Sequence, residues 1–257
     1  MEYIVIIIIS LLASLLTFFS GFGLGTLLMP VFAIYFPVDI AIALIGLVHF
    51  ANNLFKFGLI RKFIDWPTAL HFGVPAMVAA LAGAWLLSQL SRMPPLFTWH
   101  WDEKKFFITP INLIVSLLLL VFVLLEMSPR LQKLNFGRDK LLLGGLLSGF
   151  FGGLSGHQGA LRSAFLMKAG LSKEGFVATG VIIACLIDVS RLLMYADRLS
   201  GLNKDEYAGM VAMGTLAAFA GAYAGSRLLK KVTMHQVQRF VSVMLILISL
   251  ALGAGLI

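Results

Sequence analysis

The chain alternates between long apolar segments and short polar connections. Two apolar segments, 3–36 and 141–169, are interrupted by glycines. The uninterrupted apolar segments cover 40–60, 66–90, 106–127, 173–195, 207–229 and 237–257. A helix needs roughly 20 apolar residues to cross a bilayer, and these segments are long enough. The pattern predicts an all-α polytopic membrane protein, with an aromatic-rich loop at 91–105.

The two glycine breaks occupy matching places in an internal repeat. Adding 135 to the residue numbers carries Ser20-Gly21 onto Ser155-Gly156, and the same shift carries Asn53 onto Asp188. Glycine-broken apolar segments at corresponding places in two halves of a chain indicate a transporter binding site.

The repeat also predicts how the chain divides. The first membrane repeat is expected at 1–127, a basic cytoplasmic linker at 128–140 and the second repeat at 141–257. Residues 80–85 match residues 218–223 at a shift of 138, and their small side chains predict close helix packing.

Basic residues decide whether each broken segment crosses the membrane once or returns as a hairpin. Hairpins place 12 basic residues on one face and 5 on the other, whereas single crossings give 9 and 8. Positive charge accumulates on the cytoplasmic side, so hairpins are favoured. Three spans follow each hairpin, so the second repeat enters the membrane with inverted topology. The depth of the two hairpins stays open.

Composition agrees with a membrane protein and excludes several other classes. Hydrophobic residues make up 60% of the chain and charged residues 12%, whereas about 25% charged is ordinary for a soluble domain. The net charge of +8 comes mainly from the connections, so it indicates topology and not nucleic-acid binding. Cys185 is the only cysteine, which excludes an intrachain disulfide.

The breaks are candidate anion sites. The second limb of each hairpin is expected to begin near Leu24 and Gly159, where the first amide N–H groups lack helical partners and the helix dipole favours an anion. Glycines that only permit tight packing are the alternative. The predicted substrate-binding residues are Ser20, Gly21, Gly23, Gly25, Asn53, Ser155, Gly156, His157, Gln158, Gly159 and Arg162.

Arg162 stands out among them because an intramembrane arginine is costly and indicates function. Its guanidinium can hold an oxyanion through two N–H groups. The alternative is a structural ion pair with Asp188.

Ionisable residues also occur on the span that follows each hairpin. Asp188 and His49 are the candidates for proton coupling. A static pair of Asp188 with Arg191 or Arg162, and a buried neutral His49, are the alternatives. Lys56 and Arg191 lie about one turn from their predicted span ends, so extension toward the interface is an alternative to burial.

Three stretches, 20–30, 152–163 and 173–180, together with the duplicated layout, resemble the sulfite exporter TauE/SafE family. The resemblance covers nearly the whole chain and implies a secondary transporter of sulfur-containing oxyanions or organic acids, such as sulfite, sulfonates and sulfoacetate. The family pattern places a proline after the glycines in each half. Met29-Pro30 keeps it, whereas Ser163-Ala164-Phe165 lacks it. This departure bears on the substrate and not on the transport class.

The sequence therefore predicts a secondary transporter for a small, sulfite-like anion that works by alternating access. An anion channel of the same architecture is the alternative, and a membrane-embedded enzyme is disfavoured. No cofactor and no metal site are predicted. The expected partners are the anion and the lipid bilayer, without nucleic acid, and a homodimer is among the open oligomeric states. The expected location is the cell (inner) membrane, with both termini on the non-cytoplasmic side.

Overall fold

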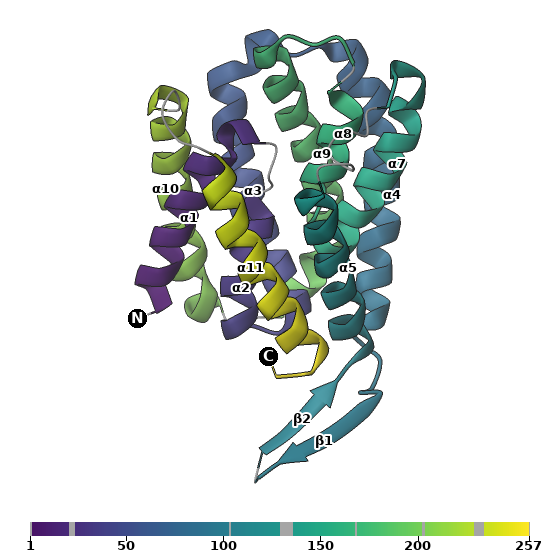
Figure 1. The fold of residues 1–257 in the computed structure, drawn as a ribbon, viewed down its shortest axis with the longest axis vertical. Helices are drawn as coiled ribbons and strands as arrows, with labels where there is room; N and C mark the ends of the chain where they lie inside the picture. The colour runs from purple at the N-terminus through teal and green to yellow at the C-terminus, as the bar shows by residue number, and fades with distance from the viewer. Residues whose placement is uncertain are drawn as a thin grey trace.

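The computed structural model describes residues 2–20, 24–102, 104–128, 136–167, 169–201, 204–228 and 234–256. Its helices form a bundle whose two chain ends lie at the same end, the lower one in Figure 1. In chain order the elements are α1 (Glu2–Ser20), α2 (Leu24–Tyr35), α3 (Val38–Ile60), η1 (Arg61–Phe63), α4 (Trp66–Leu90), β1 (Phe97–Trp101), β2 (Lys104–Ile108), α5 (Pro110–Met127), η2 (Arg138–Lys140), α7 (Leu141–Ser155), α8 (Gly159–Leu166), α9 (Lys173–Ser200), α10 (Lys204–Leu228) and α11 (Met234–Gly253).

Four of the described helices are long and apolar enough to cross a membrane. They cover Val38–Phe63, Trp66–Leu90, Lys173–Ala196 and Tyr207–Ser226. Shorter apolar stretches occur at Tyr3–Leu15, Pro110–Leu125 and Ser242–Gly253. The prediction of a helical protein that crosses the membrane several times is confirmed.

The prediction of a loop at 91–105 holds for 91–96 and is wrong from residue 97, where a β-hairpin begins. Phe97–Trp101 and Lys104–Ile108 form an antiparallel hairpin around Asp102, which has the left-handed φ of 54°. Alternating aromatic and polar residues over 97–101 give the period of two that suits a strand. Helix α5 accordingly begins at Pro110 and not at residue 106.

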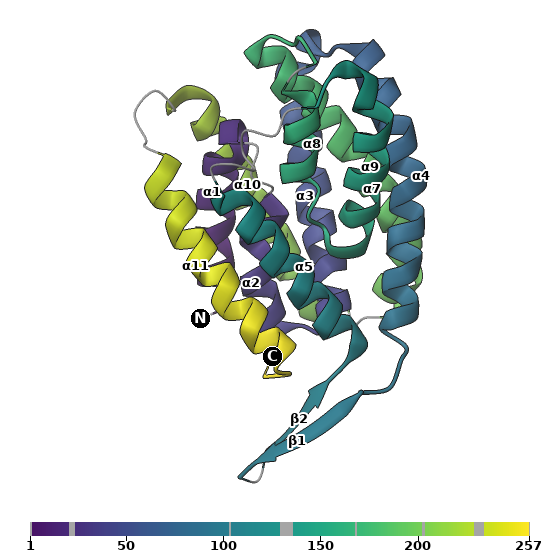
Figure 2. The same ribbon diagram turned by 45° about the vertical axis from the view of Figure 1, so that its right-hand side comes forward.

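Both broken segments fold back as helical hairpins. In the second hairpin, α7 ends at Gly156, whose φ of 78° is left-handed and therefore suits glycine. Figure 2 shows α7 entering the bundle from the upper end and α8 returning toward it. Eight residues make α8 roughly 12 Å long at ~1.5 Å per residue, too short to cross a bilayer of ~30 Å. The second limb of this hairpin is therefore shorter than a membrane span.

Backbone-to-backbone packing joins the two halves. The most extensive interhelical contacts are those of α4 with α7 and of α1 with α10. Three glycines of α7 face α4 so closely that an added Cβ would overlap backbone carbonyl oxygens; the pairs are Gly145 with Phe72, Gly149 with Ala76 and Gly153 with Ala80.

The matched small residues make the same kind of contact in both halves. A Cβ on Gly83 would overlap the carbonyl oxygen of Phe150, and a Cβ on Gly221 would overlap that of Leu11. The predicted close packing of 80–85 and 218–223 is thus confirmed.

The connection between α3 and α4 is fixed by Asp65. Its carboxylate caps α4 by accepting from the Thr68 N–H at 3.0 Å. Hydrogen bonds from the Thr68 side chain and from this N–H lower the pKa of Asp65 below its ordinary value. Its own N–H donates to Thr179 Oγ1 at 3.0 Å, which ties the start of α4 to α9.

Candidate functional site

The two glycine breaks meet inside the bundle. A Cβ on Gly25, in the first turn of α2, would lie 3.4 Å from the carbonyl oxygen of Gly156. The second limbs begin at Leu24 and Gly159, as predicted from the sequence. Their N-terminal amide groups thus belong to one region of the protein. Gly21, Gly23 and the Ser20 side chain, also predicted here, lie outside the described residues.

Asp188 of α9 is the centre of a buried polar network and has no exposed surface. His49 Nδ1 lies 2.6 Å from Asp188 Oδ2 and Arg191 Nε donates to Oδ1 at 2.9 Å. Gln158 Nε2 donates to Oδ1 at 3.3 Å, and Asn53 Nδ2 to Oδ2 at 3.5 Å. The carboxylate therefore connects α3, α9 and the second break. Asn53 and Asp188, related by the repeat, lie together.

Arg191 is the partner of Asp188, so the pair with Arg162 does not form. The Arg191 side chain is completely buried and Lys56 is 5% exposed, so neither extends to the interface. Arg191 Nη2 is 2.8 Å from Asp188 Oδ1, yet Nη1 and Nη2 lack a hydrogen-bond partner among the described residues. A Cβ on Gly156 would lie 3.0 Å from Nη1. Unsatisfied buried donors are costly, so this guanidinium edge is suited to an anionic ligand.

The polar side chains of the second break differ in whether their hydrogen-bonding groups already have partners in the protein. Ser155 Oγ donates to the Phe151 carbonyl at 3.0 Å, which occupies its hydroxyl hydrogen. His157 Nδ1 donates to the Ser155 carbonyl at 2.8 Å, and its ring stacks on Phe122 of α5. Because Nδ1 carries the hydrogen, Nε2 of a neutral ring is an acceptor, and it is buried without a partner among the described residues.

Gln158 forms a hydrogen-bonded bridge between Arg162 and Asp188. Its Oε1 accepts from Arg162 Nη1 at 3.4 Å, while its Nε2 donates to Asp188. Its backbone carbonyl accepts from Ser148 Oγ at 3.1 Å. Arg162 is half-buried and its Nε lies 3.5 Å from where a Cβ on Gly180 would be. Arg162 thus belongs to the network through Gln158.

A second group of polar residues links α3 to α1 and α10. With the Asn52 amide oriented to satisfy both its atoms, Oδ1 accepts from Lys56 Nζ at 3.3 Å and Nδ2 donates to the Ala218 carbonyl at 3.2 Å. Ser14 of α1 bonds to the same amide. Ser14 and Tyr195, which donates to the Gly153 carbonyl, were not singled out from the sequence. The only signal for Ser14 in the sequence is that it is one of a few serines in the apolar helix α1.

The charges of this core favour an anion. Three basic residues of the predicted spans, Lys56, Arg162 and Arg191, lie at the network or beside it. Asp188 is the one carboxylate that the described residues place among them. Within the described part of the chain, no three His, Cys, Asp or Glu side chains gather as metal ligands would.

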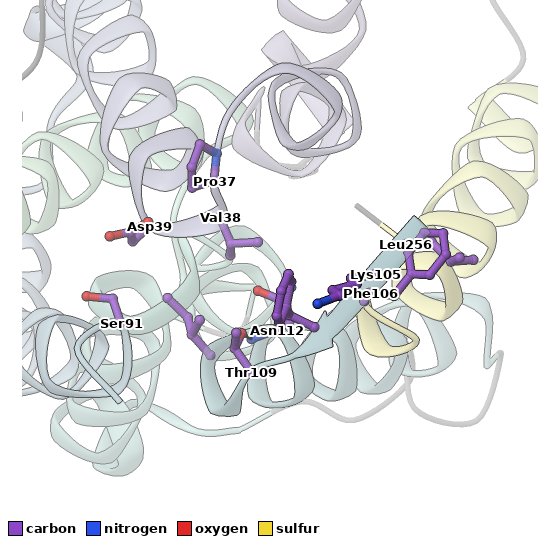
Figure 3. A pocket seen from close by; sticks show the side chains of 12 residues that line it. Pro37, Val38, Asp39, Ser91, Lys105, Phe106, Thr109, Asn112 and Leu256 are labelled. Atoms are coloured by element: carbon purple, nitrogen blue, oxygen red, sulfur yellow. Dashed lines mark hydrogen bonds between the residues drawn. The ribbon is translucent and has the colours of Figure 1, made fainter. Parts of the chain in front are cut away.

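The cavity drawn in Figure 3 lies away from this network, at the end of the bundle that carries the termini. It has a volume of about 460 Å³ and is bordered by the start of α3, the end of α4, the base of the β-hairpin and the chain after α11. Asp39, Lys105 and Asn112 are among its polar residues. None of the predicted site residues borders it.

A family model matches nearly the whole chain. The family model described as "Sulfite exporter TauE/SafE" matches residues 6–252, a range that includes both breaks and the whole Asp188 network. No curated protein matches the chain.

Proposed function

Because the chain belongs to the sulfite exporter TauE/SafE family of membrane transporters, we propose that it is a secondary transporter for a small sulfur-containing oxyanion or organosulfonate. The observation that carries this proposal is Arg191, a fully buried guanidinium whose Nη1 lies beside the second break and has no hydrogen-bond partner among the described residues. An oxyanion would satisfy these donors and compensate the surplus positive charge. Burial of the site supports alternating access over an open channel.

The proposed site extends over both breaks. Gly21, Gly23, Gly25, Ser155, Gly156 and Gly159 would shape it, while Ser20, Asn53, His157, Gln158, Arg162 and Arg191 would contact the anion. The approach of Gly25 to Gly156 supports a shared site, because it brings two helix N-termini together. Arg191 is added to the residues predicted from the sequence.

A screen of anions tests the substrate class directly. Sulfite, sulfate, thiosulfate and sulfonates are each added to the purified protein, and thermal unfolding is followed. A bound anion stabilises the folded state by about 2.7 kcal/mol at 100 times its dissociation constant, so at least one sulfur anion should raise the melting temperature. Chloride at equal ionic strength is the control. Equal melting temperatures in all these salts would count against the proposal.

The helix packing supports two repeats of inverted topology. Helices α3 and α9, the first spans after each hairpin, run antiparallel, because Phe63 lies beside Gly175 and His49 beside Asp188. Helix α7 runs parallel to α4, and α1 parallel to α10. In both pairs, glycines later in one helix contact residues later in the other. Corresponding helices of the two halves thus have opposite directions, as an inverted repeat requires.

We place both termini on the non-cytoplasmic side of the inner membrane. Arg61, Lys62 and Lys173 lie together at the end of the bundle opposite the termini, where the positive-inside rule places the cytoplasm. Alkaline phosphatase fused after residue 256 should therefore be active, whereas green fluorescent protein fused there should stay dark. A fluorescent fusion would reverse this orientation.

We further propose that proton and anion bind together. Asp188 is the counter-ion of Arg191 and also bonds to His49, so protonation at this pair releases positive charge for the anion. Arg162 and Lys56 add further positive charge, which a bound anion would offset. Binding of each ligand then favours the other, and by linkage the coupling is reciprocal.

The pH dependence of binding tests this coupling. The affinity for methanesulfonate, whose charge is constant over the range, should rise as the pH falls, by roughly 5- to 150-fold if the coupling is of usual size. In Asp188→Asn the affinity should become nearly independent of pH. His49→Gln, which keeps the carboxylate, should weaken the dependence. Equal pH dependence in wild type and Asp188→Asn would exclude Asp188 as the proton site.

A further inference from the structure

The β-hairpin has two chemically different faces. Side chains alternate along a strand, and the register pairs Trp99 with Phe106 and Trp101 with Lys104. One face is formed by five apolar side chains and a lysine, namely Phe97, Trp99, Trp101, Phe106, Ile108 and Lys104. The opposite face is mainly polar, with Thr98, His100, Lys105 and Phe107. We refer to the first as the aromatic face.

Only part of the aromatic face is covered by the protein. Trp99 stacks on Phe106, with 4.5 Å between the ring centroids, and donates from Nε1 to the Ala254 carbonyl at 2.9 Å. These contacts fix the hairpin to the chain just after α11. Phe97 and Trp101, on the same face, are 68% and 71% exposed. Large aromatic side chains this exposed indicate a surface that something else covers.

The position of the hairpin identifies the lipid bilayer as the covering. Figures 1 and 2 show it leaving the end of the bundle and running obliquely below the C-terminus. Because Trp99 bonds to the end of α11, the aromatic face turns toward the membrane helices and not away from them. Tryptophan prefers the headgroup region, and Lys104 beside Trp101 suits lipid phosphates.

We propose that the aromatic face of this hairpin docks into the headgroup layer of the leaflet at this end of the bundle. Phe97 and Trp101 enter the layer, Lys104 contacts phosphate, and His100 and Lys105 face the water. The hairpin is thereby an interfacial anchor for the ends of α4 and α5, which it connects. A second copy of the chain or a soluble protein on this face would be a different occupant.

Spin labels on the two faces test the proposal. Cys185 is buried and is the only cysteine, so Cys185→Ala provides a cysteine-free background. Phe97→Cys and Trp101→Cys each place a label on the aromatic face, and either leaves the other aromatic side chain intact. His100→Cys, adjacent to Trp101 but on the other face, is the matched control. The protein is reconstituted in vesicles of phosphatidylcholine and phosphatidylglycerol.

Collisions of the labels with oxygen and with a water-soluble nickel reagent decide the outcome. Labels at 97 and 101 should collide readily with oxygen and several-fold less with nickel than the label at 100. Free access of nickel to all three labels would place the hairpin in water and overturn the proposal. Labels at 97 and 101 shielded from both reagents would indicate a protein partner and overturn it equally.

Discussion

Replacing Arg191 with lysine is expected to reduce anion transport to background while the protein still inserts into the membrane. Lysine keeps the charge but cannot bond to Asp188 and present a second pair of N–H groups at Gly156. Losing one partner of a buried charged hydrogen bond costs ~2–5 kcal/mol, so uptake into vesicles should fall roughly 30-fold or more. Wild-type transport in Arg191→Lys would remove Arg191 from the proposed site.

A double variant separates binding from folding. Arg191→Ala alone removes the arginine partner of the buried Asp188 carboxylate, which is destabilising by itself. Asp188→Asn combined with Arg191→Gln removes both charges and should restore the folded protein without restoring transport. If Asp188 and Arg191 formed only a structural pair, this double variant would transport. Arg162→Ala, which leaves the Asp188–Arg191 pair intact, is expected to lose transport too, as the sequence predicts.

Introducing leucine at Gly149 is expected to prevent α7 from packing on α4. An added Cβ there would overlap the backbone of Ala76, and backbone cannot move aside as a flexible side chain does. Overpacking a close contact costs typically ~1–3 kcal/mol, and the overlap here places the effect at about 3 kcal/mol or more. The yield of monodisperse protein and its melting temperature measure the effect.

Gly58 is the matched control for this substitution. It also lies within a helix, α3, but nothing is within 4 Å of the position that a Cβ would take. Gly58→Ala should therefore be neutral, or stabilising by up to ~1 kcal/mol through helix propensity. Equal losses of folded protein in Gly149→Leu and Gly58→Ala would show that glycine content, and not close packing, matters.

The membrane spans and the region of the site could be predicted, because bilayer thickness determines the first and glycine breaks in the apolar segments mark the second. Bilayer thickness fixes the length of an apolar span, and the bounds of α4 agree with the predicted segment at both ends. The glycine breaks interrupt such spans visibly. The repeat then predicts that Asn53 and Asp188 occupy equivalent places, and the structure brings them within 3.5 Å.

The burial of Arg191 could not be predicted, because the apolar pattern ends before the helix does. The predicted span ends at residue 195, whereas α9 continues to Ser200, so Arg191 lies well inside the helix. Asp197 and Arg198 make this last part polar, and hydropathy alone cannot distinguish a helix that extends beyond the hydrocarbon from a loop.

Other features depend on tertiary contacts without a local pattern. The bond from Tyr195 to the Gly153 carbonyl and the stacking of His157 on Phe122 join residues from different helices. The β-hairpin was missed for another reason. Phe106, Phe107 and Ile108 continue the apolar run of α5, so they resemble the start of that helix, and only the alternation across 97–101 indicates a strand.

Counterflow of radiolabelled sulfite in proteoliposomes tests the central claim most directly. Wild-type protein should give saturable uptake that unlabelled sulfite inside the vesicles accelerates. This is because an alternating-access carrier then returns its site to the outside with unlabelled sulfite bound. The double variant Asp188→Asn with Arg191→Gln should give none. Linear uptake without acceleration would contradict alternating access, and unchanged counterflow in the double variant would contradict the site at Arg191.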